Sequence, residues 1–354
     1  MLGKGKALIP LLVVVAAGGF FLKSVVYGNA DKSIHIVQAD PVEMEGMMKN
    51  GKIDGFVAAE PFNTQAVEDG LGKYLHESSA VMRGYPGSVL AVSTENADSD
   101  AELALVWAHV KATQFIKSSS NHDKVLKYAM QLSGKNREVV EKAVENIEYV
   151  NFPEEKNLRD YYDELSQTGM LTKNIGDRNY ANRDSFFKAF LYKKYIHIIE
   201  QKLLEDPNWI PPQVSSNSRV SLGYLDSDLH GLAVYIAEKE GFYRQTGLIA
   251  EQNLQLKSYH NSAELMEAFA AHEVTAGYVG SATAMLKRVN DNLPINILAG
   301  ANNAGSAFVV KADERIDTLE ELSGKTIAVP AMGGVQYAAL ERAAQQNGLV
   351  LKRE

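Results

Sequence analysis

Residues 220–242 read VSLGYLDSDLHGLAVYIAEKEGF, and they contain the unit on which the fold is built. Val220 to Tyr224 predict a short strand, a polar loop follows, and the amphipathic helix after it ends at Gly241. Residues 253–282 continue with NLQLKSY, NSAELMEAFAAHE and VTAGYVGSA, which predict a strand, a helix and a second strand. Strands that alternate with helices of this length predict a parallel sheet with helices on its faces.

The same two units recur at the two ends of the chain. The first unit is repeated in residues 326–349, TIAVPAMGGVQYAALERAAQQNGL, and the second in residues 33–61, SIHIVQADPVEMEGMMKNGKIDGFVAAEP. When the second units are aligned, Glu43 falls on Glu264, although few residues are identical. A chance similarity between two helix–strand units is the alternative. The pattern and its spacing favour two lobes built on one plan.

Each chain end alone would leave half a sheet with an exposed apolar edge, so we expect the two ends to build one lobe together. The strands Thr326–Val329 and Ile34–Val37 should then lie in one parallel sheet. The expected lobe II comprises residues 31–93 plus 311–354, and the expected lobe I, with its helical layer, residues 94–202 plus 219–310. Between them, residues 203–218 read LLEDPNWIPPQVSSNS, whose prolines and serines are typical of a linker.

The composition is that of a globular protein, with 45% hydrophobic and 23% charged residues. A formal net charge of −8 and the lack of a basic stripe argue against nucleic-acid binding. The sequence has no cysteine, which excludes disulfides, thiolate metal sites, cysteine nucleophiles and a lipidated cysteine anchor. It also lacks GxSxG, HExxH and P-loop motifs, and its eight histidines are scattered. We therefore expect no cofactor, no metal and no catalytic residues.

The first thirty residues have the pattern of a targeting segment. Lys4 and Lys6 precede an unbroken apolar run from Ala7 to Leu22, and Lys23 closes it. This pattern predicts a signal peptide cleaved after Ala30, or an uncleaved N-terminal membrane anchor, with a buried core helix as the remaining alternative. Both targeting interpretations place the rest of the chain outside the cytoplasm, in the periplasm or on the extracellular face of the membrane.

Several stretches with consistent spacing resemble one known family. They are LGYLDSDLHGLAVYIAEKEGFY (222–243), EVTAGYVGSATAM (273–285), PINILAGANNAGSAFVV (294–310) and LEELSGKTIAVPAMGGVQYAALERA (319–343), followed in family order by PVEMEGMMKNGKIDGFVAAEPF (41–62), RGYPGSVLAV (83–92) and LVWAHVKATQFI (105–116). The chain is thus similar to the nitrate/sulfonate/taurine, or NitT/TauT-type, family of periplasmic binding proteins, over roughly residues 31–205 and 219–354.

This resemblance implies an α/β fold like that of the type II periplasmic binding proteins, in which two doubly wound lobes enclose a ligand cleft. The order of the segments departs from the family, because the family's later portion comes first here. The sequence therefore reads as a circular permutant. A tandem array of two binding proteins, trimmed at both ends, is the alternative.

The family resemblance further implies the substrate-binding component of an ABC importer, with a permease and its ATPase as partners. The implied ligand is a small organic or inorganic anion of the sulfonate, nitrate or bicarbonate type. Three alternatives stay open: a binder of a pyrimidine or other heterocyclic precursor, a membrane-tethered ligand-sensing domain, and an enzyme of precursor biosynthesis on the same fold.

In folds of this type the ligand lies at the carboxyl ends of the strands, between the lobes. Fourteen residues at strand ends and in the loops that follow are the candidate ligand-binding residues: Glu60, Tyr85, Asp226, Ser227, Asp228, His230, Gly280, Ser281, Thr283, Asn303, Ser306, Gly333, Gly334 and Gln336. We place no lysine or arginine among them, so an anion would depend on N–H groups and hydroxyls.

Structural roles compete with ligand binding for several of these candidates. Asp226 and Asp228 are in positions suited to helix capping, and Tyr85 suits a packing role. Glu60 is the least ordinary, because a carboxylate at a buried strand end is costly without a partner. Two groups, Ser281 with Thr283 and Gly334 with Gln336, should face a common cleft from opposite lobes, each at the start of a helix.

Overall fold

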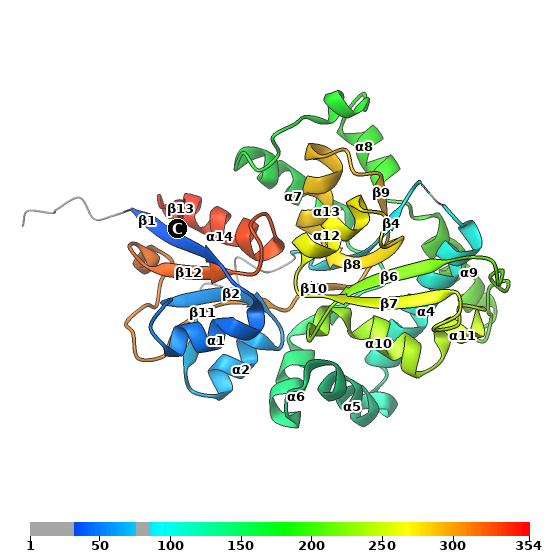
Figure 1. Ribbon diagram of the computed structural model, residues 1–354, viewed down its shortest axis with the longest axis horizontal. Helices are drawn as coiled ribbons and strands as arrows, with labels where there is room; N and C mark the ends of the chain where they lie inside the picture. The colour runs from blue at the N-terminus through cyan, green and yellow to red at the C-terminus, as the bar shows by residue number, and fades with distance from the viewer. Residues whose placement is uncertain (1–31, 76–84, 96) are drawn as a thin grey trace, which may run out of the picture. The chain divides into compact units, whose positions relative to one another are not determined.

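The computed structural model describes residues 32–75, 85–95 and 97–354, which form two α/β lobes (Figure 1). The α/β architecture predicted from the alternation of strands and helices is thereby confirmed. The expected signal peptide or anchor in residues 1–30 lies outside the described residues. Within the described ranges, no helix combines the length and apolar character needed to cross a membrane.

A six-stranded sheet forms the centre of lobe II. Its strand order is β13 (Val350–Arg353), β1 (Ser33–Gln38), β12 (Thr326–Val329), β2 (Gly55–Ala59), β11 (Ser306–Lys311) and β3 (Gly72–Tyr74). The first four strands run parallel, and β11 is antiparallel to both of its neighbours.

The two ends of the described chain meet in this sheet, where blue β1 lies between red β13 and orange β12 (Figure 1). His35 is in register with Thr326 of β12 and with Lys352 of β13. The backbone N–H of Glu354 also donates to the carbonyl of Ile36 at 3.1 Å. This pairing is the one that the divided repeat predicts. The permuted segment order itself stays a prediction.

Helices cover both faces of the lobe II sheet, with α1 (Pro41–Lys49) and α2 (Phe62–Glu68) on one face and α14 (Val335–Gln346) on the other (Figure 1). Strand β2 shows how the pleat divides the core. Phe56 and Ala58 pack with α1 and α2, whereas Val57 between them belongs to the cluster that contains α14. Because both faces are covered, the strand is apolar throughout instead of alternating.

A five-stranded sheet forms the centre of lobe I. Its order is β7 (Leu254–Tyr259), β6 (Val220–Leu225), β8 (Ala276–Gly280), β4 (Ser88–Ser93) and β9 (Ile295–Gly300). The first three strands are parallel, and β4 is antiparallel to β8 and β9. Between the lobes, β10 (Asn302–Ala304) pairs with β5 (Ile147–Tyr149) in a two-stranded sheet.

Most of the remaining helices surround the lobe I sheet. They are α4 (Ser99–Lys117), α5 (His122–Ser133), α6 (Arg137–Glu145), α7 (Glu155–Gln167), α8 (Arg183–Phe190), α9 (Lys194–Glu205), α10 (Leu232–Lys239), α11 (Phe242–Gln245), α12 (Ser262–Ala270) and α13 (Ser281–Asn290). The long helix α4 packs against α10 through fully buried residues such as Trp107. On the opposite face, Gly277 leaves room for Leu265 and Phe269 of α12.

The lobes exchange strands, and this exchange differs from the boundaries expected at residues 93 and 311. Strand β4, placed by the sequence in lobe II, lies in the lobe I sheet beside β8 and β9. Strand β11, placed in lobe I up to residue 310, lies in the lobe II sheet beside β2 and β3. The period of apolar residues identifies a strand, but it carries no information about which sheet the strand joins.

The expected linker is shorter and more firmly attached than its composition suggests. Helix α9 continues to Glu205, so the irregular segment begins only after that residue. Val214 is buried, and its N–H donates to the carbonyl of Thr246 at 2.8 Å. The indole N–H of Trp107 donates to the carbonyl of Trp209 at 2.9 Å. These contacts hold the segment against lobe I.

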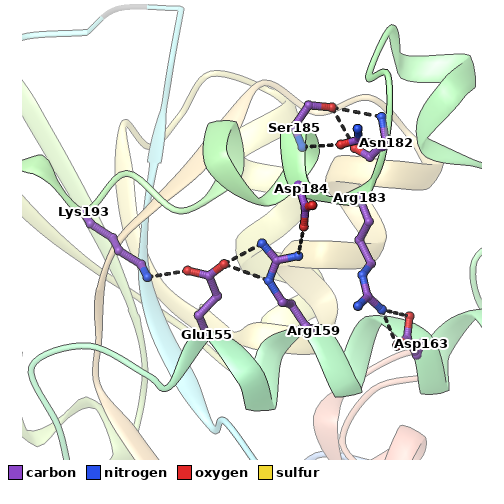
Figure 2. Close-up of polar contacts among 8 residues, drawn as sticks. All are labelled: Glu155, Arg159, Asp163, Asn182, Arg183, Asp184, Ser185 and Lys193. Carbon is purple, nitrogen blue, oxygen red and sulfur yellow. Dashed lines mark hydrogen bonds and ion pairs between the residues drawn. The ribbon is translucent and has the colours of Figure 1, made fainter.

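Ion pairs join α7, α8 and the start of α9 on the side of lobe I (Figure 2). Arg159 of α7 donates from Nε to Glu155 at 2.8 Å and from Nη1 to Asp184 of α8 at 2.7 Å. Its guanidinium also lies 4.7 Å from the ring centre of Phe187. Lys193, which precedes α9, donates to the other oxygen of Glu155 at 2.5 Å. Arg159 therefore connects the helices more than any other member of this group drawn in Figure 2.

Replacing Arg159 with alanine should lower the free energy of unfolding by about 1–2 kcal/mol, since it removes ion pairs with Glu155 and Asp184 and a cation–π contact. Lys156→Ala is the matched control, because Lys156 lies on the same helix and pairs only with the exposed Asp160. Urea titration measures both variants. Equal losses of stability would contradict a connecting role for Arg159.

Candidate functional site

An enclosed cavity of about 40 Å³ lies between the lobes. A cavity needs roughly 10–15 Å³ of this volume to hold a single water, so it has room for about three water-sized groups. Its walls are formed by Pro41, Ala59, Phe62, Gly87, Ser88, Leu225, Asp226, Asp228, His230, His260, Asn261, Ser262, Gly280, Ser306, Pro330, Ala331, Gly334, Val335 and Gln336.

The cavity lies where parallel strands from both sheets end. In lobe I, β6, β7 and β8 end immediately before or at Asp226, His260 and Gly280. In lobe II, β1, β2 and β12 end close to Pro41, at Ala59 and before Pro330. The carboxyl ends of parallel strands meet at one edge of a sheet, which is where ligands bind in open α/β folds.

Two cavity-lining glycines precede helices, but only one of these helix starts is open. Gly334 is the N-cap of α14 and provides no side-chain acceptor, so N–H groups of the first turn can serve an external acceptor. Gly280 is the N-cap of α13, but the next N–H, that of Ser281, already donates to the carbonyl of Gly87 at 2.8 Å. The expectation that both helices offer their first N–H groups to the cleft is wrong for Ser281.

The side chains of Ser281 and Thr283 do not line the cavity, in contrast to the prediction. The Ser281 hydroxyl donates to the carbonyl of Pro86 at 2.6 Å and is completely buried. This bond attaches α13 to the segment that enters β4. Thr283 is also buried, and its hydroxyl has no hydrogen-bond partner among the described residues. The hydroxyl of Ser281 therefore has a structural role, in which it holds the loop before β4.

Asp228 and His230 form a buried pair in the cavity wall, around the short helical turn η3 (Leu229–Gly231). One Asp228 oxygen accepts the N–H of His230 at 2.8 Å and lies 3.5 Å from His230 Nδ1. Burial raises the pKa of Asp228, and the charge of His230 opposes this effect. His230 Nε2 is buried beside Gly305 and has no hydrogen-bond partner among the described residues. Asp228 therefore caps the turn and lines the cavity.

A histidine between two carboxylates marks the mouth of the cavity. His260 Nδ1 is 3.1 Å from Asp226 Oδ2 in lobe I and 3.6 Å from Asp40 Oδ2 in lobe II. Burial raises the pKa of Asp226, while His260 lowers it. Asp226 thus contributes to the cavity wall, and it also takes part in a polar contact between the lobes.

Lobe II contributes a hydrogen-bonded amide and hydroxyl. Gln336, in the first turn of α14, donates from Nε2 to the hydroxyl of Ser306 on β11 at 3.1 Å, and both side chains line the cavity. Gly333 does not line the cavity itself. Its φ of +83° forms the turn that places Gly334 there, a conformation that favours glycine.

Glu60 is buried behind the cavity wall, between the lining residues Ala59 and Phe62. Its Oε1 accepts from Asn146 Nδ2 at 2.9 Å, and its Oε2 accepts from the N–H of Thr64 at 3.3 Å. Asn146 follows α6 of lobe I, so the first of these bonds crosses between the lobes. Burial raises the pKa of Glu60 to about 7, against the effect of these hydrogen bonds.

Three further predicted residues lie away from the cavity. Tyr85 donates to Glu164 of α7 and packs edge-on against Tyr161, with 4.7 Å between ring centres. Asn303 donates to Glu148 at 3.1 Å across the two-stranded sheet. Ser227 occupies a turn position with a φ of +57°. The structure gives these residues packing and turn roles in place of contact with the cavity.

The sequence reasoning missed His260, Asn261 and Ser262, which all line the cavity. Asn261 caps α12 by accepting the N–H of Ala263 at 3.0 Å, and the Ser262 hydroxyl accepts the N–H of Gly280 at 3.1 Å. The signal was present, because these residues also connect a strand end to a helix start. Gly87 and Ser88 were missed for another reason: they begin the antiparallel strand β4, whose sheet the sequence did not reveal.

The cavity wall is more apolar than polar, and its described residues include no permanent cation. Among its described lining residues there is no lysine or arginine, and the charged groups are two aspartates and two histidines. In the described ranges, no group of three or more histidine, aspartate or glutamate side chains is arranged to hold a metal ion. The site can therefore donate hydrogen bonds from backbone N–H groups, Gln336 and His230, and it carries acidic groups close by.

Two family models match the chain. The NMT1-like family matches residues 11–130, and the NMT1/THI5 like family matches residues 230–353. Together these regions contain most of the cavity wall, including the segments that hold Ala59, His260 and Gln336.

Curated relatives share parts of the chain. The bicarbonate transport ATP-binding protein CmpC of Synechococcus elongatus is 29% identical over 99 residues, which are 27% of this chain and 15% of the relative. The nitrate import ATP-binding protein NrtC of Synechocystis is 30% identical over 102 residues, 28% of this chain and 15% of the relative. The nitrate/nitrite binding protein NrtA of Nostoc is 24% identical over 148 residues, 40% of this chain and 32% of the relative.

The chain thus spans 15% of the length of the two ATP-binding relatives and 32% of NrtA. The chain is thus similar to NMT1-like proteins over residues 11–130, to NMT1/THI5 like proteins over residues 230–353, and in part to the nitrate/nitrite binding protein NrtA.

Proposed function

We propose that the chain captures a small oxyanion, of the nitrate or bicarbonate type, as the substrate-binding component of an ABC importer. The observation that carries this proposal is the enclosed cavity between the lobes, with its volume of about 40 Å³. Pockets for drug-sized ligands are roughly 300–1,000 Å³, so this one suits a ligand of a few heavy atoms. The open helix start at Gly334, the Gln336 amide and the free Nε2 of His230 can each donate to an oxyanion.

The names of the relatives support the same class of ligand, since they refer to nitrate, nitrite and bicarbonate transport. In the proposed role, the protein binds its ligand without chemical change and delivers it to a permease driven by an ATPase. It acts outside the cytoplasm, on the basis of the targeting pattern in residues 1–30. Sulfonates belong to the same proposal as slightly larger anions.

A heterocyclic ligand is the second candidate, and the acidic groups favour it. Asp226 and Asp228 line the cavity, and carboxylates can accept hydrogen bonds from ring N–H and amino groups. A pyrimidine precursor has more heavy atoms than the cavity admits, so the lobes would have to stand further apart to bind it. The small volume therefore favours the oxyanion.

The test is a thermal-shift screen with nitrate, bicarbonate, methanesulfonate, taurine and a hydroxymethylpyrimidine, followed by calorimetric titration. A ligand at a hundredfold excess over its dissociation constant stabilises the protein by about 2.7 kcal/mol. We expect nitrate or bicarbonate to give the largest shift. A shift only with the pyrimidine would replace the oxyanion proposal with the second candidate.

Gln336→Ala should weaken binding of the anion roughly ten- to a hundredfold, because a hydrogen bond to a charged group contributes about 1.5–3 kcal/mol. Gln345→Ala is the matched control, since Gln345 lies on the same helix and bonds the exposed Glu341. Calorimetry measures the affinities, and circular dichroism checks the fold. Equal affinities in the two variants would place the anion away from Gln336.

A further inference from the structure

Two buried carboxyl groups lie beside a cavity that we assign to an anion. Asp228 lines the cavity, and Glu60 lies behind its wall between two lining residues. Their backbones are also linked, because the N–H of Leu229 donates to the carbonyl of Glu60 at 3.1 Å. Asp228 belongs to lobe I and Glu60 to lobe II, so the two residues meet where the lobes join.

No permanent cation neutralises this pair. Among the described residues, Glu60 has no ion-pair partner, and the partner of Asp228 is His230. The groups that face Glu60 are neutral amides and hydroxyls: Asn63 and Thr64 of α2, Asn146 after α6, Tyr74 of β3 and Tyr149 of β5.

The surrounding charged groups are few. Lys142 of α6 is paired with Glu68 at 2.5 Å, and Lys135, which follows α5, lies 6.0 Å from the ring centre of Phe62. Asp226 acts on Asp228 as a second negative charge. An anion in the cavity would therefore meet negative charge from both lobes, at close range and away from bulk water.

We propose that the protein binds its anion together with one proton, which the Glu60–Asp228 pair takes up from solvent. This inference rests on the proposed function, and it names a regulation of the same site. Protonation removes the repulsion between the anion and the nearest carboxylate. It also converts an acceptor into a hydrogen-bond donor. The proton is assigned to these two carboxyl groups together, and substitution of each one tests its share.

The raised pKa of Glu60 places uptake by that carboxyl group near neutral pH. Burial raises the pKa of Glu60 to about 7 and raises that of Asp228 from its ordinary value. A nearby anion raises both further, because it disfavours the charged form. Linkage is reciprocal, so an anion that promotes protonation binds more tightly when the proton is present.

Calorimetric titration with nitrate or methanesulfonate tests the proposal, since both probes stay anionic throughout the range used. At pH 7.5, titrations in phosphate and in Tris should show an uptake of roughly half to one proton per anion. Between pH 7 and 9 the affinity should fall by up to about tenfold per pH unit. In Glu60→Gln the uptake should decrease, and the affinity at pH 8.5 should exceed that of the wild type.

Asp228→Asn is the second variant, because asparagine preserves the acceptor for the N–H of His230. It should also reduce the uptake. Glu102→Gln is the matched control: Glu102 is a buried glutamate on α4, bonded to Tyr195 and distant from the cavity wall. Its proton uptake should equal that of the wild type.

Two outcomes would overturn the inference. If either anion bound tightly without proton exchange, or with release of a proton, the proposed proton uptake would be wrong. The proposed oxyanion function would be unaffected. Failure of both anions to bind at pH 6, together with no thermal shift from bicarbonate in the screen above, would refute the proposed function and this inference with it.

Discussion

When the pH is raised from 4 to 9, the free energy of unfolding of the wild type should fall by about 3 kcal/mol more than that of Glu60→Gln. The pKa of Glu60 rises from 4.5 to about 7 on folding, because the carboxyl is buried. At 1.36 kcal/mol for each tenfold change, this rise corresponds to roughly 3 kcal/mol. Between these two values the folded state binds more protons than the unfolded state, so stability decreases as pH increases.

The full contribution of Glu60 is thus present below about pH 4.5 and lost above about pH 7. Glutamine cannot ionise. The free energy of unfolding of the variant therefore lacks the pH dependence that Glu60 causes, whether the substitution itself raises or lowers stability. Chemical denaturation at intervals across the range measures the difference between the two curves. Glu200→Gln, an exposed position on α9, is the control and should follow the wild type. Parallel curves for wild type and Glu60→Gln would show that Glu60 ionises alike in both states.

Gly305→Ala should destabilise the fold by about 2–5 kcal/mol and weaken anion binding. Gly305 has a φ of +76°, where alanine is strained by roughly 1–2 kcal/mol. An added Cβ would also lie 2.4 Å from Nε2 of His230 and 2.7 Å from Ile147 Cγ1. Overpacking of this kind typically adds 1–3 kcal/mol. Because the imidazole has to move, the nitrogen that we assign to the ligand is displaced.

The matched control is Gly134→Ala, at the end of α5. Gly134 has a φ of +69°, but no atom lies within 4 Å of the Cβ position, so only the backbone strain applies. Urea titration and calorimetry with the anion measure both variants. If both lost the same stability and kept the same affinity, the contact between Gly305 and His230 would have no role in the site.

Substitutions near Glu60 should affect both stability and binding, because contacts between α2 and the end of α6 connect the two lobes there. Lys142 pairs with Glu68 and Asn146 bonds Glu60, so two polar contacts join lobe I to lobe II along one side. On another side, Arg342 of α14 lies 3.3 Å from Glu164 of α7. Changes at these residues alter how the lobes meet, which is also where the cavity lies.

The order of strands and helices, and the edge at which the cavity lies, could be predicted from the sequence. The apolar periods over residues 220–282 and their copies at the chain ends identify the parallel strands. The junctions after these strands contain Asp228, Gly280 and Gln336, which line the cavity. These features depend on local periodicity, which a sequence records directly.

The partners of each side chain were decided only by the tertiary structure. Ser281 was expected in the cleft, yet its hydroxyl bonds Pro86, which is 195 residues away in the chain. His260 reaches the mouth of the cavity because β7 lies beside β6, and Asn146 meets Glu60 because α6 packs on α2. Strand β4 joins lobe I for a similar reason. Local pattern shows that a residue ends a strand, but long-range packing determines what lies opposite it.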